Sequence, residues 1–268
     1  TPMKTRIRPA AVAGRFYPAD AASLRQMIQS FLATAPRTGG DPKAIIAPHA
    51  GYVYSGPIAA SAYASWAAAR DTIRRVVLVG PSHFVPFRGL ALPSSEAFET
   101  PLSEVPVDRE ALQRLLALPR VQLLDEAHTN EHSLEVQLPF LQTVLYRFSI
   151  VPVLAGQASD SEVCAVLEAL WGGPETRFVI SSDLSHYLDS PTARRVDRAT
   201  AKAIEGLRPE DISEEQACGR IPIRGLLAAA RGHDLRVQTL DLRNSGDTAG
   251  SPSRVVGYGA FAFVPAGT

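Results

Sequence analysis

Apolar residues along the chain follow two patterns, one typical of amphipathic helices and one typical of strands buried on both faces. Residues 20–35 repeat apolar side chains at spacings of three and four, which predicts a helix with Asp20 as its N-cap. Two uninterrupted apolar runs, within residues 43–48 and 74–80, predict strands that are covered on both faces. Further strands are expected at residues 89–93, 148–156, 177–183, 235–242 and 255–264.

Helical spacing recurs between these strands. Residues 56–70 predict an alanine-rich helix that begins at Pro57, because proline is favoured in the first helical turn. Residues 133–145 also have helical spacing, although Pro139 should kink that helix or shorten its first half. Other helices are expected near residues 108–118, 159–171, 192–206 and 222–231.

The alternation of strands and helices predicts the fold class. Alternating elements with several uniformly apolar strands are typical of an α/β protein, here a three-layer α/β/α sandwich around a mostly parallel or mixed central sheet. Residues 1–268 contain no internal repeat, low-complexity tract or linker, so we expect a single domain.

The charge balance and the cysteine content narrow the possible partners and compartments. Lys plus Arg and Asp plus Glu each number 27, which argues against nucleic acid or an anionic membrane as the main partner. The two cysteines, Cys164 and Cys218, are too few and too far apart for a secreted disulfide framework. The chain opens without a signal-peptide pattern, and no apolar run approaches the roughly 18 residues of a membrane-spanning helix. We therefore expect a cytoplasmic protein.

Ionisable side chains follow three of the predicted strands. His49 and His83 each come shortly after a strand, and Asp183 and His186 follow a third. In open α/β sheets, ligands bind beyond the carboxyl ends of the strands, so these side chains should face one crevice. The spacing of Asp183 and His186 predicts that they lie on one side of a helical turn. A single histidine is usually structural, but three after three strands indicate a functional site.

Cys218 is the next candidate, since it lies just ahead of a helix whose first turn should contain Pro222. The unpaired amides at a helix N-terminus shift a thiol toward thiolate, which is a good ligand for soft or borderline metals. Gly219 permits a tight turn there, and Arg220 would further favour the anion. The alternative is a buried, inert cysteine, and Cys164 fits that description well.

The segment from residue 125 to residue 140 adds His128, Glu131, His132 and Glu135. Glu131 and Glu135 are four residues apart at the start of a predicted helix, and so should share one face. They are either solvated acids at a helix start, or Glu131 or His132 supports a neighbouring site. The sequence has no dinucleotide-binding, P-loop or nucleophile-elbow motif.

Seven ordered motifs give the chain a family resemblance. They read APHAGYVYSG, GPSHFVPF, ETPLSEVPVD, NEHSLEVQLPFL, IVPVLAG, SSDLSHY and CGRIPI. From about Arg8 to the final strand the chain resembles the Memo family, whose prokaryotic members are often called AmmeMemoRadiSam system protein B. That family is similar in fold to the catalytic subunit of the class III extradiol ring-cleaving dioxygenases.

The resemblance implies a metal site. It assigns the metal ligands to His49, His83 and Cys218, and places Asp183 and His186 beside them. The metal would be Fe(II) in the first place, copper in the second, and zinc less readily. Two histidines and a thiolate form a softer set than the two histidines and one carboxylate of an extradiol dioxygenase.

Two functions from different classes follow. The first is a metal-dependent redox protein or oxygenase, in which His186 moves a proton and Asp183 orients a ligand or His186. In that function the tyrosines Tyr52 and Tyr54 would wall the pocket, with Glu131 and His132 behind it. The second is an adaptor for a small molecule or peptide that keeps a vestigial pocket.

The resemblance also implies a radical-SAM protein and an AMMECR1-like protein as partners. A zinc hydrolase is a third, weaker option.

Overall fold

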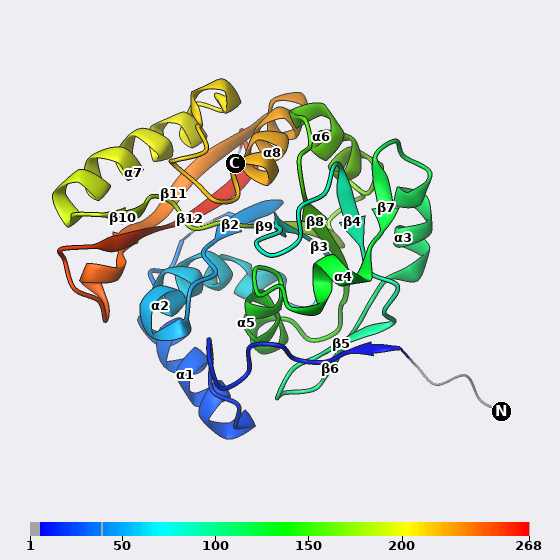
Figure 1. The fold of residues 1–268 in the computed structure, drawn as a ribbon, viewed down its shortest axis with the longest axis horizontal. Coiled ribbons are helices and arrows are strands. Elements are labelled where there is room, and N and C mark those ends of the chain that lie inside the picture. The colour runs from blue at the N-terminus through cyan, green and yellow to red at the C-terminus, as the bar shows by residue number, and fades with distance from the viewer. Residues whose placement is uncertain (1–5, 39, 268) are drawn as a thin grey trace.

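The computed structural model describes residues 6–38 and 40–267, and a central sheet dominates them (Figure 1). Its strand order is β10 (His186–Leu188), β12 (Val255–Pro265), β2 (Ala44–Ala47), β9 (Thr176–Ser181), β3 (Arg75–Pro81), β8 (Ser149–Ala155), β4 (Leu90–Leu92) and β7 (Val121–Leu123). Strand β11 (Leu235–Asn244) pairs with β12. The four strands β2, β9, β3 and β8 are mutually parallel, while β12 joins β2 antiparallel. The sheet is therefore mixed with a parallel centre.

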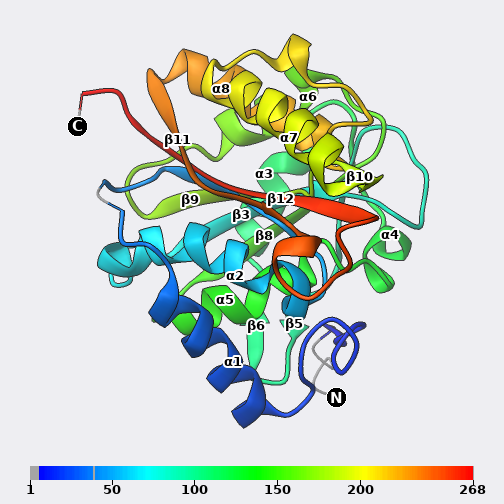
Figure 2. The ribbon, with the colours of Figure 1, turned by 90° about the vertical axis from the view of Figure 1, so that its left-hand side faces the viewer.

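Helices cover both faces of this sheet (Figure 2). One layer contains α1 (Ala21–Thr34), α2 (Tyr52–Tyr63) and α5 (Leu138–Val144). The opposite layer contains α3 (Arg109–Leu116), α6 (Asp160–Ala169), α7 (Ser190–Glu205) and α8 (Arg220–Gly232). The predicted three-layer α/β/α fold with a mixed central sheet is confirmed.

Smaller elements complete the described part of the chain. A separate three-stranded sheet consists of β1 (Ile7–Arg8), β5 (Ala97–Glu99) and β6 (Glu104–Pro106). A short helix α4 (Asp125–Thr129) and four 3-10 turns lie between the longer elements: η1 (Ala64–Ala69), η2 (Glu135–Gln137), η3 (Pro209–Asp211) and η4 (Ser245–Asp247). No helix among the described residues has both the length and the apolar character needed to cross a bilayer.

The parallel strands form the core because their side chains are apolar on both faces. Ile45 and Ile46 of β2 and Val77 of β3 have no exposed surface, and every residue of β9 is buried. Burial of one such side chain contributes roughly 1.5–3 kcal/mol to folding. A sheet held from both faces fixes the positions of its strand ends, from which the loops of the candidate site begin.

Two of the predicted helix boundaries are informative. Helix α2 begins at Tyr52 with Gly51 as its N-cap, and the prediction that it begins near Pro57 is wrong. Pro57 removes only the bond to the carbonyl of Val53, and the helix continues through it. The predicted effect of Pro139 is confirmed, because α5 starts only at Leu138 and a 3-10 turn precedes it.

Candidate metal centre

Three adjacent strand ends converge as the sequence predicts. Strand β9 lies between β2 and β3 in parallel register, so the loops that follow these strands share one edge of the sheet. They carry His49, His83 and Asp183. The ring centroids of His49 and His83 are 5.1 Å apart, and Asp183 lies within hydrogen-bonding distance of the backbone of His49.

A third imidazole belongs to the same cluster. His132 stacks on His83 with 4.6 Å between ring centroids and lies 5.4 Å from the ring of His49. The three histidines offer ligand nitrogens that all lie within 4.8 Å of one another. The sequence suggested His132 only as a supporting residue, because its segment follows no predicted strand and the strand-end rule was not applied to it.

Hydrogen bonds fix the tautomer of His49. The hydroxyl of Ser181 donates to the carbonyl of Ser133 at 2.6 Å and accepts from the Gln137 amide at 3.0 Å. Its remaining contact, 2.8 Å to Nδ1 of His49, must therefore receive a proton from the imidazole. Burial lowers the pKa of His49 to about 3, so the ring is neutral. The free lone pair of His49 is consequently on Nε2.

Glu131 orients the ring of His83, as Ser181 orients that of His49. One oxygen of its carboxylate accepts from Nδ1 of His83 at 2.8 Å, and the other accepts from the backbone N–H of His83 at 2.6 Å. The N–H groups of His132 and Ser133 also donate to Glu131, each at 3.0 Å. Burial raises the pKa of Glu131, but the hydrogen bonds and the charge of His83 outweigh it and lower the pKa to about 2. An ionised Glu131 can only accept, so Nδ1 of His83 carries a proton, and Nε2 is the nitrogen that a neutral His83 ring would offer to a metal.

The predicted helical face shared by Glu131 and Glu135 is wrong. Glu131 precedes the 3-10 turn η2, and its carboxylate turns inward to the histidines. Glu135 turns to the other side, where it pairs with Arg8 and has no exposed surface. Neither is a solvated acid, because both are buried and backbone and side-chain donors surround each carboxylate.

Cys218 contacts the cluster at His49. Its sulfur lies 3.3 Å from Nε2 of His49 and accepts from the N–H of Asp183 at 3.4 Å. The sulfur is not among the three ligand atoms that lie within 4.8 Å of one another. The predicted shift toward thiolate is wrong, since burial and the nearby charge of Asp183 raise the pKa of Cys218 to about 12. The protonated thiol can donate to Nε2 of His49.

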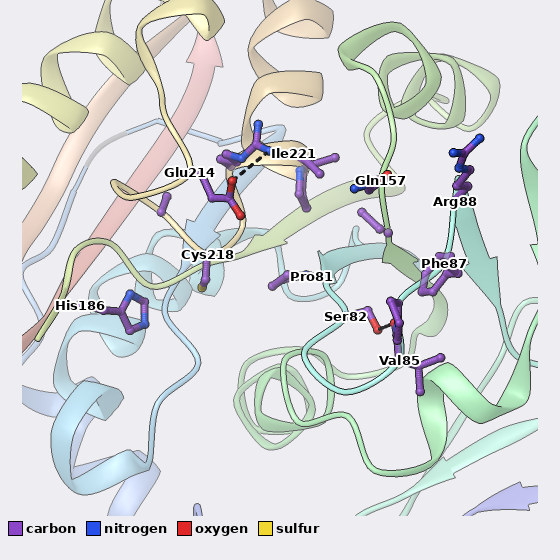
Figure 3. Close-up of a pocket in the computed structure, with 16 residues that line it drawn as sticks. Pro81, Ser82, Val85, Phe87, Arg88, Gln157, His186, Glu214, Cys218 and Ile221 are labelled. Atoms are coloured by element: carbon purple, nitrogen blue, oxygen red, sulfur yellow. Dashed lines mark hydrogen bonds and ion pairs between the residues drawn. The ribbon is translucent and has the colours of Figure 1, made fainter.

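Asp183 and His186 leave β9 in an extended loop, so the predicted helical turn is wrong. The N–H of Leu184 donates to the carbonyl of Gly257 at 2.8 Å, and that of Ser185 donates to Asp197 at 3.0 Å. These bonds hold the loop against β12 and α7. Asp183 is buried, accepts from the N–H of His49 at 2.8 Å, and has its pKa raised by desolvation. His186 begins β10 and lines a neighbouring cavity of about 730 Å³ together with Cys218 (Figure 3).

The two tyrosines lie at different depths. Tyr52 is buried, and its hydroxyl donates to the carbonyl of Val136 at 2.5 Å. Tyr54 is 41% exposed on the outer side of α2. Behind them, the hydroxyl of Tyr63 donates to Gln137 at 2.5 Å and so orients the amide that contacts Ser181. Gln137 and Ser181 lie within the motifs NEHSLEVQLPFL and SSDLSHY, but their residue types did not single them out, because amides and hydroxyls are common outside sites.

The metal-free protein is expected to lose stability as the pH falls below 6.5. Burial is the main cause that lowers the pKa of His49 to about 3, and those of His128 and His132 to about 4. Between pH 6.5 and pH 4 the unfolded chain binds protons that the folded chain excludes. Each ring therefore lowers the free energy of unfolding by on the order of 1 kcal/mol for each pH unit of acidification. Glu131, with its pKa lowered to about 2, adds a further loss below its ordinary 4.5.

Urea unfolding of metal-free protein at pH 7.5, 6.5, 5.5 and 4.5 measures the slope of the unfolding free energy against pH. In the His128→Gln variant the slope should decrease by about one third of the histidine contribution, because one of three depressed groups is removed. An unfolding free energy that stays constant from pH 7.5 to pH 5 would contradict the expected exclusion of protons.

Comparison with known proteins identifies the family to which this chain is similar. A family whose description is Memo-like protein matches residues 8–262. A MEMO1 family protein of Aquifex aeolicus is 36% identical over 94% of this chain and 97% of its own length. One from Aeropyrum pernix is 37% identical over 95% and 99%.

Among solved structures, an uncharacterized protein of Escherichia coli K12 shares the fold. Its TM-score is 0.52 at 15% sequence identity, and the match covers 80% of this chain and 98% of that one. The family motifs include the loops of His49, His83, His132, Asp183 and Cys218, which all lie within the matched residues. This chain belongs to the Memo-like family.

Proposed function

We propose that this Memo-like protein binds one redox-active metal ion at His49 and His83, completed by His132 or Cys218, and uses it in oxidoreductase chemistry. The observation that carries the proposal is the paired fixation of His49 and His83. Each ring has its Nδ1 proton on an acceptor, Ser181 or Glu131, so Nε2 is the nitrogen that each ring would offer to the ion. At His49 the ion would take the place of the Cys218 thiol proton. Metal-binding histidines are usually oriented in this way.

The donor set fits a transition metal. Neutral imidazoles suit iron, copper and zinc, and hard cations such as Mg²⁺ prefer oxygen ligands. Three histidines leave open positions on the ion, a set that zinc also accepts, but zinc has no redox chemistry and the proposed oxidoreductase would need iron or copper. Cys218, at 3.3 Å from Nε2 of His49, brings a soft donor that would favour copper after deprotonation. We therefore propose Fe(II) first, copper second and zinc last.

The residues around the ion would have separate tasks. When bound, the metal would supply electron transfer or oxygen chemistry. His186 faces the cavity beside Cys218 and would hold or move a proton there. Asp183 holds the backbone of His49 and would keep that loop in place. We further propose that the protein acts with a radical-SAM protein and an AMMECR1-like protein, on the strength of the family resemblance.

One observation favours a second function, that of a binding or adaptor protein. Four large apolar side chains are exposed on the segments that carry or follow the site residues, namely α2, the loop after β3 and strand β10: Val53, Tyr54, Phe84 and Tyr187. Tyr187 also has a backbone φ of 63°, which is uncommon for an aromatic residue. Exposed apolar groups of this kind are typical of contact surfaces. An adaptor would need no stoichiometric metal.

Metal titration tests the proposal and identifies the third ligand. Metal-free protein is titrated anaerobically with Fe(II) and, separately, with Cu(I) against a competing chelator. We expect one equivalent to bind to the unchanged protein and to a His233→Gln control, whose ring stacks on Trp171 away from the site. His132→Ala should weaken Fe(II) binding at least tenfold, while Cys218→Ser should weaken Cu(I) binding more than Fe(II) binding.

The opposite pattern would assign the ligands differently. If His132→Ala binds Fe(II) as tightly as the unchanged protein, His132 is not a ligand. If the unchanged protein takes up neither ion stoichiometrically, the redox function fails and the adaptor function remains.

A further inference from the structure

We propose that a second cavity, at the opposite end of α2 from the candidate metal centre, binds a small molecule with an aliphatic body and one carboxylate or phosphate group. The guanidinium group of Arg70 would hold that anionic group. The proposed metal function does not require this site, so the inference goes beyond it. It is carried by the cavity, by the unpaired Arg70 in its wall, and by the charge of its lining.

The cavity is remote from the histidine cluster. It lies in the layer of α1, α2 and α5 (Figure 2), and its lining residues Gly40, Arg70 and Val144 precede β2, β3 and β8 in the chain. It is therefore at the amino ends of these strands, whereas the histidines follow their carboxyl ends. His49 lies three residues before α2 begins, and Ala64 of the lining directly follows its last residue. The 12 residues of α2 rise about 18 Å, so a ligand in the cavity does not touch the proposed metal.

The cavity has the size and the walls of a small-molecule site. Its volume is about 490 Å³, within the range of roughly 300–1,000 Å³ that is typical of ligand pockets. Five alanines, together with Leu32 and Val144, form much of the wall. Alanine side chains leave open the space that longer apolar side chains would fill. Such a wall suits an aliphatic body, which gains affinity with each methylene group that it buries.

The side chain of Arg70 supplies a positive charge to this wall. Its Nε is buried without a hydrogen-bond partner, and its guanidinium group has no ion pair in the described part of the chain. Cζ of Arg70 lies 4.0 Å from the centre of the Tyr146 ring. This cation–π contact orients the guanidinium group but gives its N–H groups no acceptor. Carboxylate and phosphate oxygens are the acceptors that pair best with a guanidinium group.

The rest of the lining also favours an anion. Among the lining residues that the structure describes none is acidic, and the exposed Arg37 adds a second positive charge. The hydroxyl of Thr38, elsewhere in the wall, is a further buried polar atom without a partner among the described residues. Buried polar atoms are rarely left unpaired in native proteins, so their presence in this wall indicates a polar occupant.

Binding of matched probe compounds tests this inference. The probes are hexanoate and hexyl phosphate, with hexanamide as the neutral counterpart of hexanoate and acetate as the same anion without the aliphatic body. Affinities are measured by calorimetry with metal-free protein, at low and at high salt. We expect at least one of the two hexyl-chain anions to bind roughly tenfold more tightly than hexanamide and acetate. Its affinity should fall as the salt concentration rises.

Variants assign the binding to Arg70 and to the cavity. Arg70→Gln should weaken binding of that anion roughly tenfold, to the level of hexanamide. Arg37→Gln should weaken it no more than about threefold, because Arg37 is exposed and its charge is screened. Ala67→Phe enlarges an exposed side chain of the lining and should abolish binding by filling the cavity.

Two matched controls lie outside the cavity. Arg254→Gln removes an exposed arginine that makes a cation–π contact with Tyr187, at 4.7 Å from the ring centre. Ala199→Phe enlarges an exposed alanine of α7. Neither change should alter anion binding. Thermal unfolding of each variant checks that the fold is intact.

The outcomes separate this inference from the proposed function. Equal binding of the hexyl-chain anions and hexanamide, or unchanged anion binding by folded Arg70→Gln or Ala67→Phe, would overturn the inference. The relative affinity of hexanoate and hexyl phosphate tells whether the site is built for a carboxylate or a phosphate. Fe(II) titration of Arg70→Gln should match that of the unchanged protein. Normal metal uptake without anion binding refutes the inference alone, and anion binding without metal uptake refutes the proposed function alone.

Discussion

Replacing His49 with alanine is expected to abolish stoichiometric metal binding while leaving the protein folded. His49 is the one ring of the cluster that meets both other imidazoles and the sulfur of Cys218. Its removal takes away a ligand whichever of His132 and Cys218 completes the set. The loss should exceed the roughly 10–100-fold decrease that follows when only a hydrogen-bond partner behind a ligand is removed.

Anaerobic Fe(II) titration, with elemental analysis after desalting, measures this effect. The graded control is Ser181→Ala, which leaves His49 in place but removes the acceptor that fixes its tautomer. That variant should retain one metal equivalent at roughly 10–100-fold lower affinity. Uptake by His49→Ala equal to that of the unchanged protein would refute the histidine site as a whole.

The second large effect concerns Arg8, far from the proposed metal ligands in sequence. Its guanidinium donates to the carbonyl of Glu131 at 2.7 Å and to that of His128 at 3.0 Å, and it pairs with Glu135. Glu135 has no exposed surface and also accepts from the hydroxyl of Tyr17 at 2.8 Å. The pair thus ties the N-terminal segment to the residues that orient His83.

Arg8→Met should lower the free energy of unfolding by about 3–5 kcal/mol, because it leaves the carboxylate of Glu135 buried without its cation. It should also weaken metal binding, since the segment that holds Glu131 loses the guanidinium bonds to its carbonyls at His128, Thr129 and Glu131. Urea unfolding and Fe(II) titration measure the two effects. The double variant Arg8→Met/Glu135→Gln should recover part of the stability, because no unpaired charge remains.

An exposed ion pair provides the matched control. Arg109 pairs with Glu96 at the surface, and their side chains are 60% and 36% exposed. Arg109→Met should lower the free energy of unfolding by less than about 1 kcal/mol. If Arg8→Met costs no more than this control, the buried pair does not hold the site segment in place.

The hydrophobic pattern was sufficient for the fold class and for part of the site. Uniformly apolar runs predicted β2, β3 and β9, and the histidines that follow two of them do meet at one edge of the sheet. This worked because parallel strands that are buried on both faces leave little freedom for the loops at their ends. The pattern missed the start of α2, because Gly51 begins that helix before Pro57.

Three properties of the site depended on tertiary contacts. His132 joins the cluster from a loop that follows no predicted strand. Glu131 turns inward because backbone N–H groups of three residues surround it. The tautomer of His49 depends on Ser181, which lies 132 residues away in the sequence. Such partners cannot be predicted from local spacing.

The thiol of Cys218 shows the physical reason most clearly. From the sequence, its place before α8 indicated a lowered pKa, since the field of a helix N-terminus acts within one turn. In the folded protein its burial and the charge of Asp183 raise the pKa to about 12. The sequence by itself determined which elements form and which side chains stand at their ends, because these follow from local periodicity. Only the tertiary structure decided protonation and ligand geometry, because desolvation and hydrogen bonding depend on groups that meet through the fold.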